Sequence, residues 1–324
     1  MEKYYLAVDA GGSKVHLLLF DDAFRRVDFD VAASSNPNVN PIPEIISNMR
    51  KTYERLFFRN PAIKDLECVY ICSVCPTDIL LSSLNDMGIS IKRERGIGEG
   101  DMGMFAGGKS GDAVVALSGT GSDIYYVKDN KSVSAVGGWG ALVADEGSGY
   151  WIGREALIAA IHDYEMRGPQ TMLTKMICDR LYPNDFGKSI YSVYESSSPA
   201  RSVAAMSRIV GEAARAGDAV AVDIITRAAK LLAEQTRTLY LRFPQAYDLP
   251  LMVTGGSWKG YLLFEKFEEE IDRLYPGKKV QKPLFEPIVG GVFCHAMECG
   301  MTDEAARAIL KQNFTEDFYL LPEK

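Results

Sequence analysis

Apolar strands separated by glycine turns predict an α/β protein. Residues 4–20 give two apolar strands joined by a tight Gly-Gly-Ser turn, which is typical of a β-hairpin. Residues 113–127 repeat this design roughly 110 residues later, with the polar segment 118–123 between the strands. Further apolar strands are expected at 69–74 and at the start of 251–259. The repetition predicts two related α/β halves.

Helical periodicity dominates the region between the second hairpin and the last of these strands. Ser148 can cap a helix over about 150–164. Three further helices are expected at 203–216, 218–242 and 303–313. Residues 182–200 contain many Pro, Asn, Gly and Ser residues and predict an irregular loop.

Length and composition favour a two-domain globular protein. The chain has 324 residues, of which 47% are hydrophobic, enough for two cores. We expect a first lobe over 1–110, completed by the C-terminal segment 303–324. The second lobe, with a helical part, is expected over 111–302.

Charge and hydropathy exclude several classes of partner. The net charge is -7 and no long Lys/Arg block is present, so we expect no nucleic-acid partner. No apolar run reaches the roughly 18–20 residues that span a bilayer, so we expect no membrane partner either. The first residues lack the features of a signal peptide, which predicts a cytoplasmic protein.

Cysteine and histidine give weak chemical signals. Cys72 and Cys75 form a C-x-x-C pair, but no second pair has zinc-ligand spacing, and the pair ends a predicted buried strand. Buried, unreactive thiols are therefore the favoured interpretation. The histidines, His16, His162 and His295, fall in strand or helix patterns, and structural or surface roles are expected for them.

The glycine turns can bind phosphate, because glycine lets backbone N–H groups approach an anion closely. Neither a Walker A loop nor a Rossmann fingerprint occurs in the chain. Asp9 ends a strand beside the first turn, where a carboxylate near phosphate calls for Mg²⁺ between them. Either turn alone could be an ordinary hairpin turn. The predicted phosphate-binding residues are Gly11, Gly12, Ser13, Gly119, Thr120, Gly121 and Ser122.

These motifs resemble those of the sugar kinase/actin superfamily. Residues 9–14, including Lys14, resemble its first phosphate motif, 118–122 its second, and 253–257 its adenosine motif. Residues 137–153 are similar to the long signature of the BadF/BadG/BcrA/BcrD group, which includes N-acetylglucosamine kinases. The similarity extends from about residue 4 to about 300 and ends with a Gly-rich segment, 287–291, like the family's C-terminal glycine turn.

The resemblance implies a duplicated ribonuclease H-like fold of the actin/hexokinase type, with two domains around a nucleotide cleft. It also implies ATP and Mg²⁺ as cofactors, with Asp9 acting on the metal and Lys14 beside the phosphates. The adenosine would lie against Gly255, Gly256 and Ser257. A small-molecule sugar would contact Asn36, Gly138, Asp145 and Glu146. A homodimer is implied by analogy only.

The catalytic carboxylate is expected in the loop before the second hairpin, since a hydroxyl that attacks phosphorus must lose its proton. The family has an aspartate there, but counting without gaps places it on Gly100. A shift of one residue from Gly100 makes Asp101 the predicted proton acceptor. Glu99 lies one position before Gly100. The alternative is that Asp101 only caps a helix. In that case catalysis is weak or absent, or Asp145 is the proton acceptor instead.

The predicted function is ATP-dependent phosphorylation of a sugar hydroxyl, at C6 of an N-acetylated amino sugar. Residues 73–78 depart from the family's usual sugar-facing loop, which leaves the acceptor open. One alternative is an ATPase that activates a partner CoA-ester reductase or dehydratase, as family members with an iron–sulfur cluster do. The other is a catalytically weak sugar-binding homologue.

Overall fold

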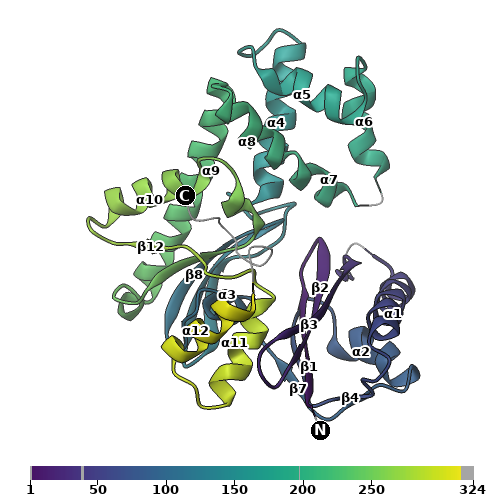
Figure 1. Cartoon of the computed structure of the whole chain (residues 1–324). Coiled ribbons are helices and arrows are strands. Elements are labelled where there is room, and N and C mark those ends of the chain that lie inside the picture. The colour runs from purple at the N-terminus through teal and green to yellow at the C-terminus, as the bar shows by residue number, and fades with distance from the viewer. Residues whose placement is uncertain (1, 38–39, 197, 315–324) are drawn as a thin grey trace. The chain divides into compact units, whose positions relative to one another are not determined.

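The computed structural model describes residues 2–37, 40–196 and 198–314 (Figure 1). The chain divides into two compact units. Unit 1 comprises 1–112, 127–133 and 282–324, and unit 2 comprises 113–126 and 134–281. The predicted lobes differ from these units over 111–112, 127–133 and 282–302, which belong to unit 1 rather than to the second lobe. Residues 315–324 of the predicted closing segment lie outside the described residues.

Both units are built on a five-stranded sheet with the same strand order. In unit 1 the order is β3 (Arg26–Ala33), β2 (Lys14–Asp21), β1 (Tyr4–Ala10), β5 (Cys68–Ser73) and β7 (Glu94–Gly96). The second sheet belongs to unit 2 except for the parts of β9 and β10 within 127–133. Its order is β10 (Lys131–Gly137), β9 (Ser122–Lys128), β8 (Ala113–Ser118), β11 (Leu251–Thr254) and β12 (Val280–Gln281). In each sheet the first strand along the chain is the central one, and its hairpin partner lies beside it. This repetition confirms the predicted duplicated α/β fold.

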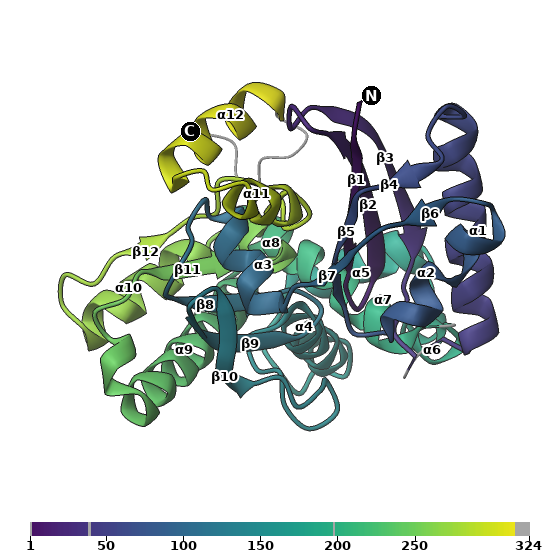
Figure 2. The ribbon, with the colours of Figure 1, turned by 90° about the horizontal axis from the view of Figure 1, so that it is seen from below.

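The unit 1 sheet places alternate residues of β1 on opposite faces. Strand β1 is antiparallel to β2 and parallel to β5. Leu6 and Val8 pack in one core cluster with residues of α1 (Ile42–Arg59) and α2 (Thr77–Asp86). Figure 2 shows these two helices on one face of the sheet. A short parallel pair, β4 (Asp65–Leu66) and β6 (Ser90–Ile91), lies in the same unit.

The opposite face of this sheet is covered by α11 (Val289–Glu298), which also packs on α3 (Glu99–Ala106). A Cβ on Gly291 would stand 2.8 Å from the Ala7 Cβ, and one on Gly290 would stand 2.4 Å from the Met102 carbonyl oxygen. Segment 287–291 is therefore not a glycine turn like the family's. Its two glycines lie in the first turn of α11 and allow close packing on β1 and α3. Helix α12 (Asp303–Asn313) follows, as predicted.

Unit 2 carries most of the helices, and Figure 1 shows α4–α8 gathered at one end of that unit. Helices α9 and α10 pack on each other and share the unit's apolar core with β8 and β11. The helices are α4 (Gly149–Tyr164), α5 (Met172–Leu181), α6 (Phe186–Glu195), α7 (Pro199–Ala205), α8 (Ser207–Arg215), α9 (Ala219–Arg242) and α10 (Leu263–Leu274), with short 3₁₀ turns at Pro244–Ala246 and Gly256–Lys259.

Most helix predictions are confirmed, with one error in unit 2. Ser148 caps α4 by accepting the Trp151 N–H, and α9 begins where residues 218–242 predicted it. The expected helix over 203–216 is two helices, α7 and α8, which meet at Met206. The prediction of an irregular loop over 182–200 is wrong, because α6 forms there. Its first residue, Phe186, stacks on Tyr164 of α4 at 4.3 Å between ring centroids, a contact that local sequence does not reveal.

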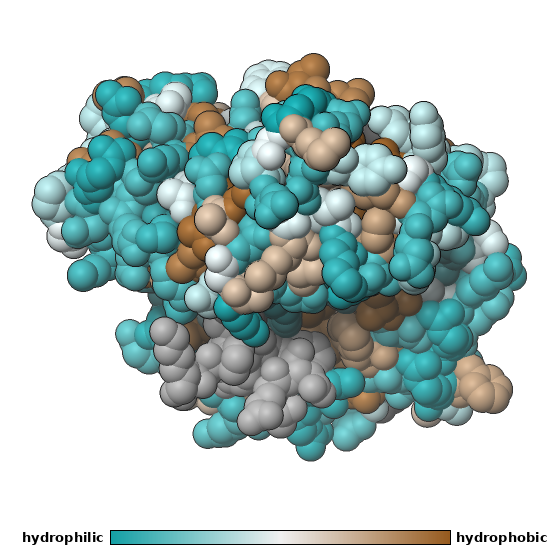
Figure 3. Space-filling model, turned by 90° about the horizontal axis from the view of Figure 1, so that it is seen from above, coloured by the Kyte–Doolittle hydropathy of each residue, from teal (hydrophilic) through white to brown (hydrophobic). Residues whose placement is uncertain are grey.

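Among the described residues, no helix has both the length and the apolar character needed to cross a bilayer. Apolar side chains still reach the surface in places. In Figure 3 they form separate brown areas between teal polar residues. Exposed apolar residues scattered in this way are normal for globular proteins.

Candidate functional site

The first glycine turn lies in unit 1, between β1 and β2. Asp9 is the penultimate residue of β1 and pairs across the hairpin with His16, whose Nδ1 lies 3.9 Å from Asp9 Oδ2. Asp9 shares a strand face with Ala7, which is the face that α11 covers. The turn, residues 11–13, follows at the carboxyl end of β1. Ligands of α/β proteins commonly bind at this end of parallel strands.

The segment that carries Asn36 is attached to this turn. The Ser34 hydroxyl donates to the Gly12 carbonyl oxygen at 2.9 Å and accepts the Asn36 N–H at 3.2 Å. Ser34 is 6% exposed, so these bonds are shielded from water. The predicted sugar-binding asparagine and the predicted phosphate turn are thus linked through one hydroxyl group.

The second glycine turn lies in unit 2. It is bonded to the signature segment, 137–153, and to the predicted adenosine segment, 253–257. The Gly119 carbonyl oxygen accepts the Gly149 N–H at 2.8 Å and the Ser257 hydroxyl at 3.0 Å. The Thr120 carbonyl oxygen accepts the Tyr150 N–H at 3.3 Å. The signature segment 137–153 and the predicted adenosine segment therefore converge on the second phosphate turn.

Hydroxyl groups at both ends of this turn strengthen the arrangement. The Ser118 hydroxyl donates to the Gly147 carbonyl oxygen at 2.9 Å. The Ser122 hydroxyl donates to the Glu146 carbonyl oxygen at 3.0 Å, and the Ser122 carbonyl oxygen accepts the Gly138 N–H at 3.0 Å. The Ser122 hydroxyl, predicted to bind phosphate, donates here to the protein backbone.

Asp145 is a strained, buried carboxylate beside this turn. Its φ is +61°, a left-handed conformation that is uncommon outside glycine, and it is only 6% exposed. The Gly140 N–H donates to Oδ1 at 3.1 Å, while Oδ2 lies against Gly121. Burial raises the pKa of Asp145, the Gly140 N–H lowers it, and the nearby Glu146 raises it further. A strained carboxyl group with a raised pKa is typical of a functional site.

Three of the predicted binding glycines have close neighbours where a Cβ would stand. A Cβ on Gly255, whose φ is +103°, would lie 2.4 Å from the Ser118 carbonyl oxygen. One on Gly121 would lie 2.7 Å from Asp145 Oδ2. One on Gly138, with φ +71°, would lie 2.1 Å from a carboxylate oxygen of Asp123. The left-handed φ together with the close neighbours explains why Gly255 and Gly138 are glycine, whereas Gly121 contacts only the end of the Asp145 side chain.

Three other predicted glycines have no such explanation. Around the Cβ positions of Gly12, Gly119 and Gly256, no atom lies within 4 Å among the residues that the structure describes, and none of the three has a left-handed φ. Gly11 has only an ordinary contact at 3.8 Å. Open space over a glycine backbone suits the close approach of a nucleotide. Residues in both units therefore fit ATP.

Asp101 is engaged within unit 1. It is 6% exposed and lies in the first turn of α3, where Oδ2 accepts the Gly98 N–H at 3.0 Å. Its Oδ1 accepts the N–H and the hydroxyl of Ser132, at 2.5 Å and 2.6 Å. The capping role is thus confirmed, and the carboxylate also ties α3 to the segment 127–133. The role of Asp101 as proton acceptor stays a prediction.

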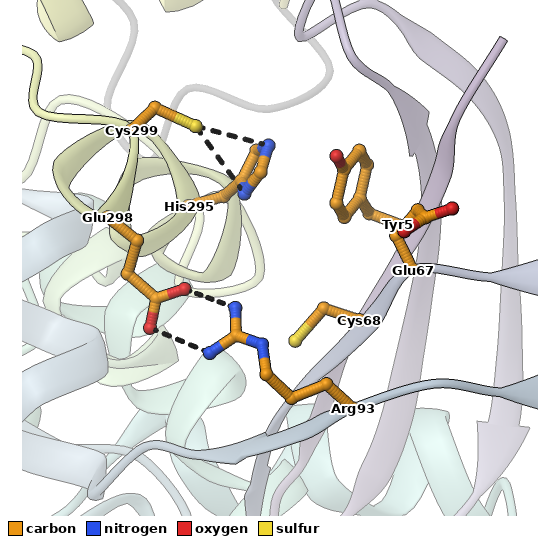
Figure 4. A pocket seen from close by; sticks show the side chains of 7 residues that line it. All are labelled: Tyr5, Glu67, Cys68, Arg93, His295, Glu298 and Cys299. Atoms are coloured by element: carbon orange, nitrogen blue, oxygen red, sulfur yellow. Dashed lines mark hydrogen bonds and ion pairs between the residues drawn. The ribbon is translucent and has the colours of Figure 1, made fainter.

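A cavity of about 230 Å³ lies away from these residues, beside Tyr5 and Cys68 at the amino-terminal ends of β1 and β5 (Figure 4). The Tyr70 hydroxyl bonds to His295 Nδ1 and to Glu298 at 2.8 Å each, and Glu298 also pairs with Arg93. Burial lowers the pKa of His295 to about 4. This cluster, which unites residues over 200 positions apart, has no local sequence signal.

The cysteines show no metal-binding arrangement in the described parts of the chain. Cys72 and Cys75 are each 4% exposed, in agreement with buried structural thiols. Burial raises the pKa of both thiols. No group of three or more His, Cys, Asp or Glu side chains among the described residues is placed to hold a metal ion.

Comparisons with known proteins agree with this geometry. A curated N-acetylmuramic acid/N-acetylglucosamine kinase of Clostridium acetobutylicum is 26% identical over 311 residues, which cover 92% of this chain and 99% of that protein. A solved structure of a candidate N-acetylglucosamine kinase from Porphyromonas gingivalis is 17% identical, with a TM-score of 0.72, and the match covers 92% of this chain and 100% of that one.

A ROK family glucokinase from Streptomyces griseus, solved with glucose and AMPPNP, shares the fold at 16% identity and a TM-score of 0.57, over 91% of this chain and 98% of that one. These structural matches confirm the actin-like ATPase fold. The family model for BadF/BadG/BcrA/BcrD ATPases matches residues 6–294, nearly the whole chain. The protein therefore belongs to the BadF/BadG/BcrA/BcrD ATPase family.

Proposed function

We propose that the protein transfers the γ-phosphoryl group of ATP to a hydroxyl group of an N-acetylated amino sugar, at C6 of an N-acetylglucosamine-like acceptor. The observation that carries this proposal is the convergence of segments 138–149 and 254–257 on the turn at Gly119. Open space over Gly119 and Gly256 leaves room for a nucleotide there. The similarity to a curated amino-sugar kinase over almost the full length supports the choice of acceptor.

The nucleotide is proposed to bind through backbone groups of both units. In unit 2, the N–H groups of 119–121 hold phosphate oxygens, with the Thr120 hydroxyl as an additional donor. The backbone of Gly255 and Gly256 lies under the adenosine, beside Ser257. In unit 1, residues 11–14 hold the phosphates from a second turn. Glycine suits these positions because a side chain would block the approach of the backbone to phosphate.

Asp9 is the proposed contact for the metal. Its side chain stands at the carboxyl end of β1 directly before the phosphate turn. Carboxylate oxygen is a preferred ligand of Mg²⁺, either directly or through water. The metal would neutralise charge on the phosphates, which is the main electrostatic requirement of phosphoryl transfer.

The sugar is proposed to contact Asn36, Gly138, Asp145 and Glu146. The Asp145 carboxylate is buried, and a sugar hydroxyl that donates to it would compensate for lost hydration. Strain at its φ of +61° fixes the direction of the side chain beside the phosphate turn. Asp145 therefore positions the acceptor near the phosphate that it receives.

The test is ADP release by the full-length protein over a panel of sugars: N-acetylglucosamine, N-acetylmuramic acid, glucosamine and glucose. We expect release that depends on an N-acetylated sugar, with the product phosphate coupled to the C6 protons in NMR spectra. The Asp145→Asn variant should raise the sugar KM while nucleotide binding is kept. ADP release without sugar dependence would instead point to a partner-activated ATPase, and ligand binding without release would leave a sugar-binding protein.

A further inference from the structure

One side of helix α9 lies against residues 146–147 of the signature segment. A Cβ on Gly147, whose φ is +84°, would stand 2.5 Å from Leu232 Cγ. Gln235, about one turn further along α9, donates from Nε2 to the Glu146 carbonyl oxygen at 3.0 Å. Residues three apart share one side of a helix, so these two contacts belong to the same surface of α9. The helix therefore holds this segment by close packing and by one side-chain hydrogen bond.

The same glutamine side chain reaches the other end of the loop 138–145. A Cβ on Gly137, whose φ is +101°, would stand 2.9 Å from Gln235 Oε1. Gly137 directly precedes the loop, and Glu146 directly follows it. Gln235 therefore lies beside both ends of the loop and connects them to α9.

Ser122, the first residue of β9, bonds to both ends of the same loop. Its carbonyl oxygen accepts the Gly138 N–H at 3.0 Å, and its hydroxyl donates to the Glu146 carbonyl oxygen at 3.0 Å. Between these ends, three large apolar side chains of the loop are mostly exposed: Trp139, Leu142 and Val143. Since these side chains pack little on the protein, the conformation of the loop depends on how its two ends are held.

The amide group of Gln235 is bonded on one side only. Its Nε2 donates to the Glu146 carbonyl oxygen, while Oε1 is buried and accepts no hydrogen bond from any residue that the structure describes. A buried acceptor without a partner lowers stability. Methionine has a similar length and would fill the space without this cost. Packing therefore does not favour glutamine here, and the hydrogen bond to Glu146 is what an apolar residue would lack.

Resting on the sugar kinase activity proposed above, we propose that Gln235 is a positioning residue for the sugar acceptor. It holds the Glu146 carbonyl group and thereby the direction of the neighbouring Asp145 carboxylate. Asp145 has a φ of +61°, and a strained conformation of this kind persists only where the surrounding structure maintains it. Because the Ser122 hydroxyl still bonds to Glu146 without Gln235, the phosphate turn is kept. Loss of Gln235 should therefore weaken sugar binding more than nucleotide binding.

The experiment measures kcat, the sugar KM, the ATP KM and Tm for Gln235→Met in the full-length protein, with the best acceptor of the sugar panel. We expect the sugar KM to rise by about tenfold, as for one lost hydrogen bond. The ATP KM and kcat should stay within about threefold of the wild type, and Tm within about 4 °C. A purely structural residue would lower Tm without this selective change in the sugar KM.

Gln235→Glu adds a test that depends on pH. An ionised carboxylate cannot donate to the Glu146 carbonyl oxygen, whereas the protonated acid can. Burial beside a carbonyl oxygen should raise the pKa of the new carboxyl group. We expect the sugar KM of this variant, divided by that of the wild type at the same pH, to fall towards one between about pH 8 and about pH 5.5. Gln235→Met should show no such recovery.

Thr236→Val is the matched control. Thr236 is the next residue of α9, is fully buried, and donates from its hydroxyl to the Leu232 carbonyl oxygen at 2.9 Å within the helix. Its loss removes one hydrogen bond of the same helix that does not involve the loop. The sugar KM of Thr236→Val should therefore stay within about twofold of the wild type.

Several outcomes overturn the inference but leave the kinase intact. They are an unchanged sugar KM in Gln235→Met, equal rises of the sugar KM and the ATP KM, an equal rise of the sugar KM in Thr236→Val, and no recovery of Gln235→Glu at low pH. A Gln235→Met chain that does not fold also overturns it, since the residue is then structural. A wild-type protein that phosphorylates no sugar overturns the proposed function itself.

Discussion

The two glycine turns differ in how much of the surrounding fold supports them. In unit 1, the carbonyl oxygen of Gly12 is bonded to the Ser34 hydroxyl. In unit 2, the carbonyl oxygen of Gly119 accepts two donors, from Gly149 and Ser257, and Gly255 packs against the turn with no room for a Cβ. The second turn is therefore fixed by two separate segments, 137–153 and 253–257, while the first is tied to one loop.

This difference suggests that the two turns have different roles in ligand binding. A rigid turn presents its N–H groups in a fixed geometry and loses little entropy when phosphate binds. The first turn is linked through Ser34 to Asn36, the predicted sugar-binding residue. Changes at Asn36 can thus reach the first glycine turn through Ser34. We expect the second turn to set nucleotide affinity and the first to couple nucleotide and sugar.

The largest effect is expected for Gly255→Ala, which tests the rigidity of the second turn. A left-handed φ and a Cβ at 2.4 Å from the Ser118 carbonyl oxygen should cost about 2–5 kcal/mol of unfolding free energy. Denaturant unfolding without nucleotide measures this cost. The matched control is Gly256→Ala, next in the chain with open space at its Cβ, which should change stability by less than about 0.5 kcal/mol. Equal losses of unfolding free energy in both variants would show that the close packing of Gly255 on Ser118 does not stabilise the turn.

Gly119→Ala and Gly12→Ala compare the two turns as ligand sites. Both Cβ atoms would enter open space, so stability should change by less than about 0.5 kcal/mol. We expect each variant to weaken binding of a non-hydrolysable ATP analogue with Mg²⁺ by about 10–100-fold, as for one or two lost hydrogen bonds to a charged group. Calorimetric titration measures this Kd. An unchanged Kd in either variant would remove that turn from the nucleotide site.

The serines that bond to the two turns, Ser34 and Ser257, should also differ in their effects on stability and on the sugar KM. Ser34→Ala removes a buried hydroxyl that bonds both Gly12 and Asn36, and we expect a loss of about 1 kcal/mol in stability and a severalfold rise in sugar KM. Ser257→Ala should have a smaller effect, because the Gly119 carbonyl oxygen keeps the Gly149 N–H. Unfolding curves and sugar KM values check both. A larger rise of the sugar KM in Ser257→Ala than in Ser34→Ala would contradict the proposal that the first turn, and not the second, couples nucleotide and sugar.

Local signals account for the parts of the fold that the sequence predicts well. The hairpins are marked by apolar strands around glycine turns, and Ser148 lies directly before the helix that it caps. The same sequence cannot indicate α6, since the stacking of Phe186 on Tyr164 depends on chain packing. The placement of 282–302 in unit 1 has a similar cause, because α11 packs on β1 and α3, which are distant in sequence.

Contacts between distant segments also limit how much of the candidate site can be predicted from the sequence. Motif spacing predicts which glycines gather around a nucleotide, but it cannot separate those required by packing, such as Gly255, from those that face open space, such as Gly119. That distinction depends on neighbours from other segments. The contact of Asp101 with Ser132 joins residues 31 positions apart, so the sequence alone cannot show that this carboxylate is bonded to another segment.

The smallest effect is expected for Asp145→Asn, beside the second turn. Asparagine accepts a left-handed φ and carries no charge, so unfolding free energy at pH 7 should rise by about 0.5 kcal/mol, at the low end of gains from relieving strain at functional sites. Because burial raises the pKa of Asp145 above its unfolded value, the carboxyl group favours folding at low pH and loses that contribution as pH rises. The advantage of the variant should therefore be greater at pH 7 than at pH 4, as measured by denaturant unfolding at both values. An Asn variant that is less stable at pH 7 would mean that the ionised carboxylate helps to hold the second turn, so the rigidity of that turn would depend on charge as well as on packing.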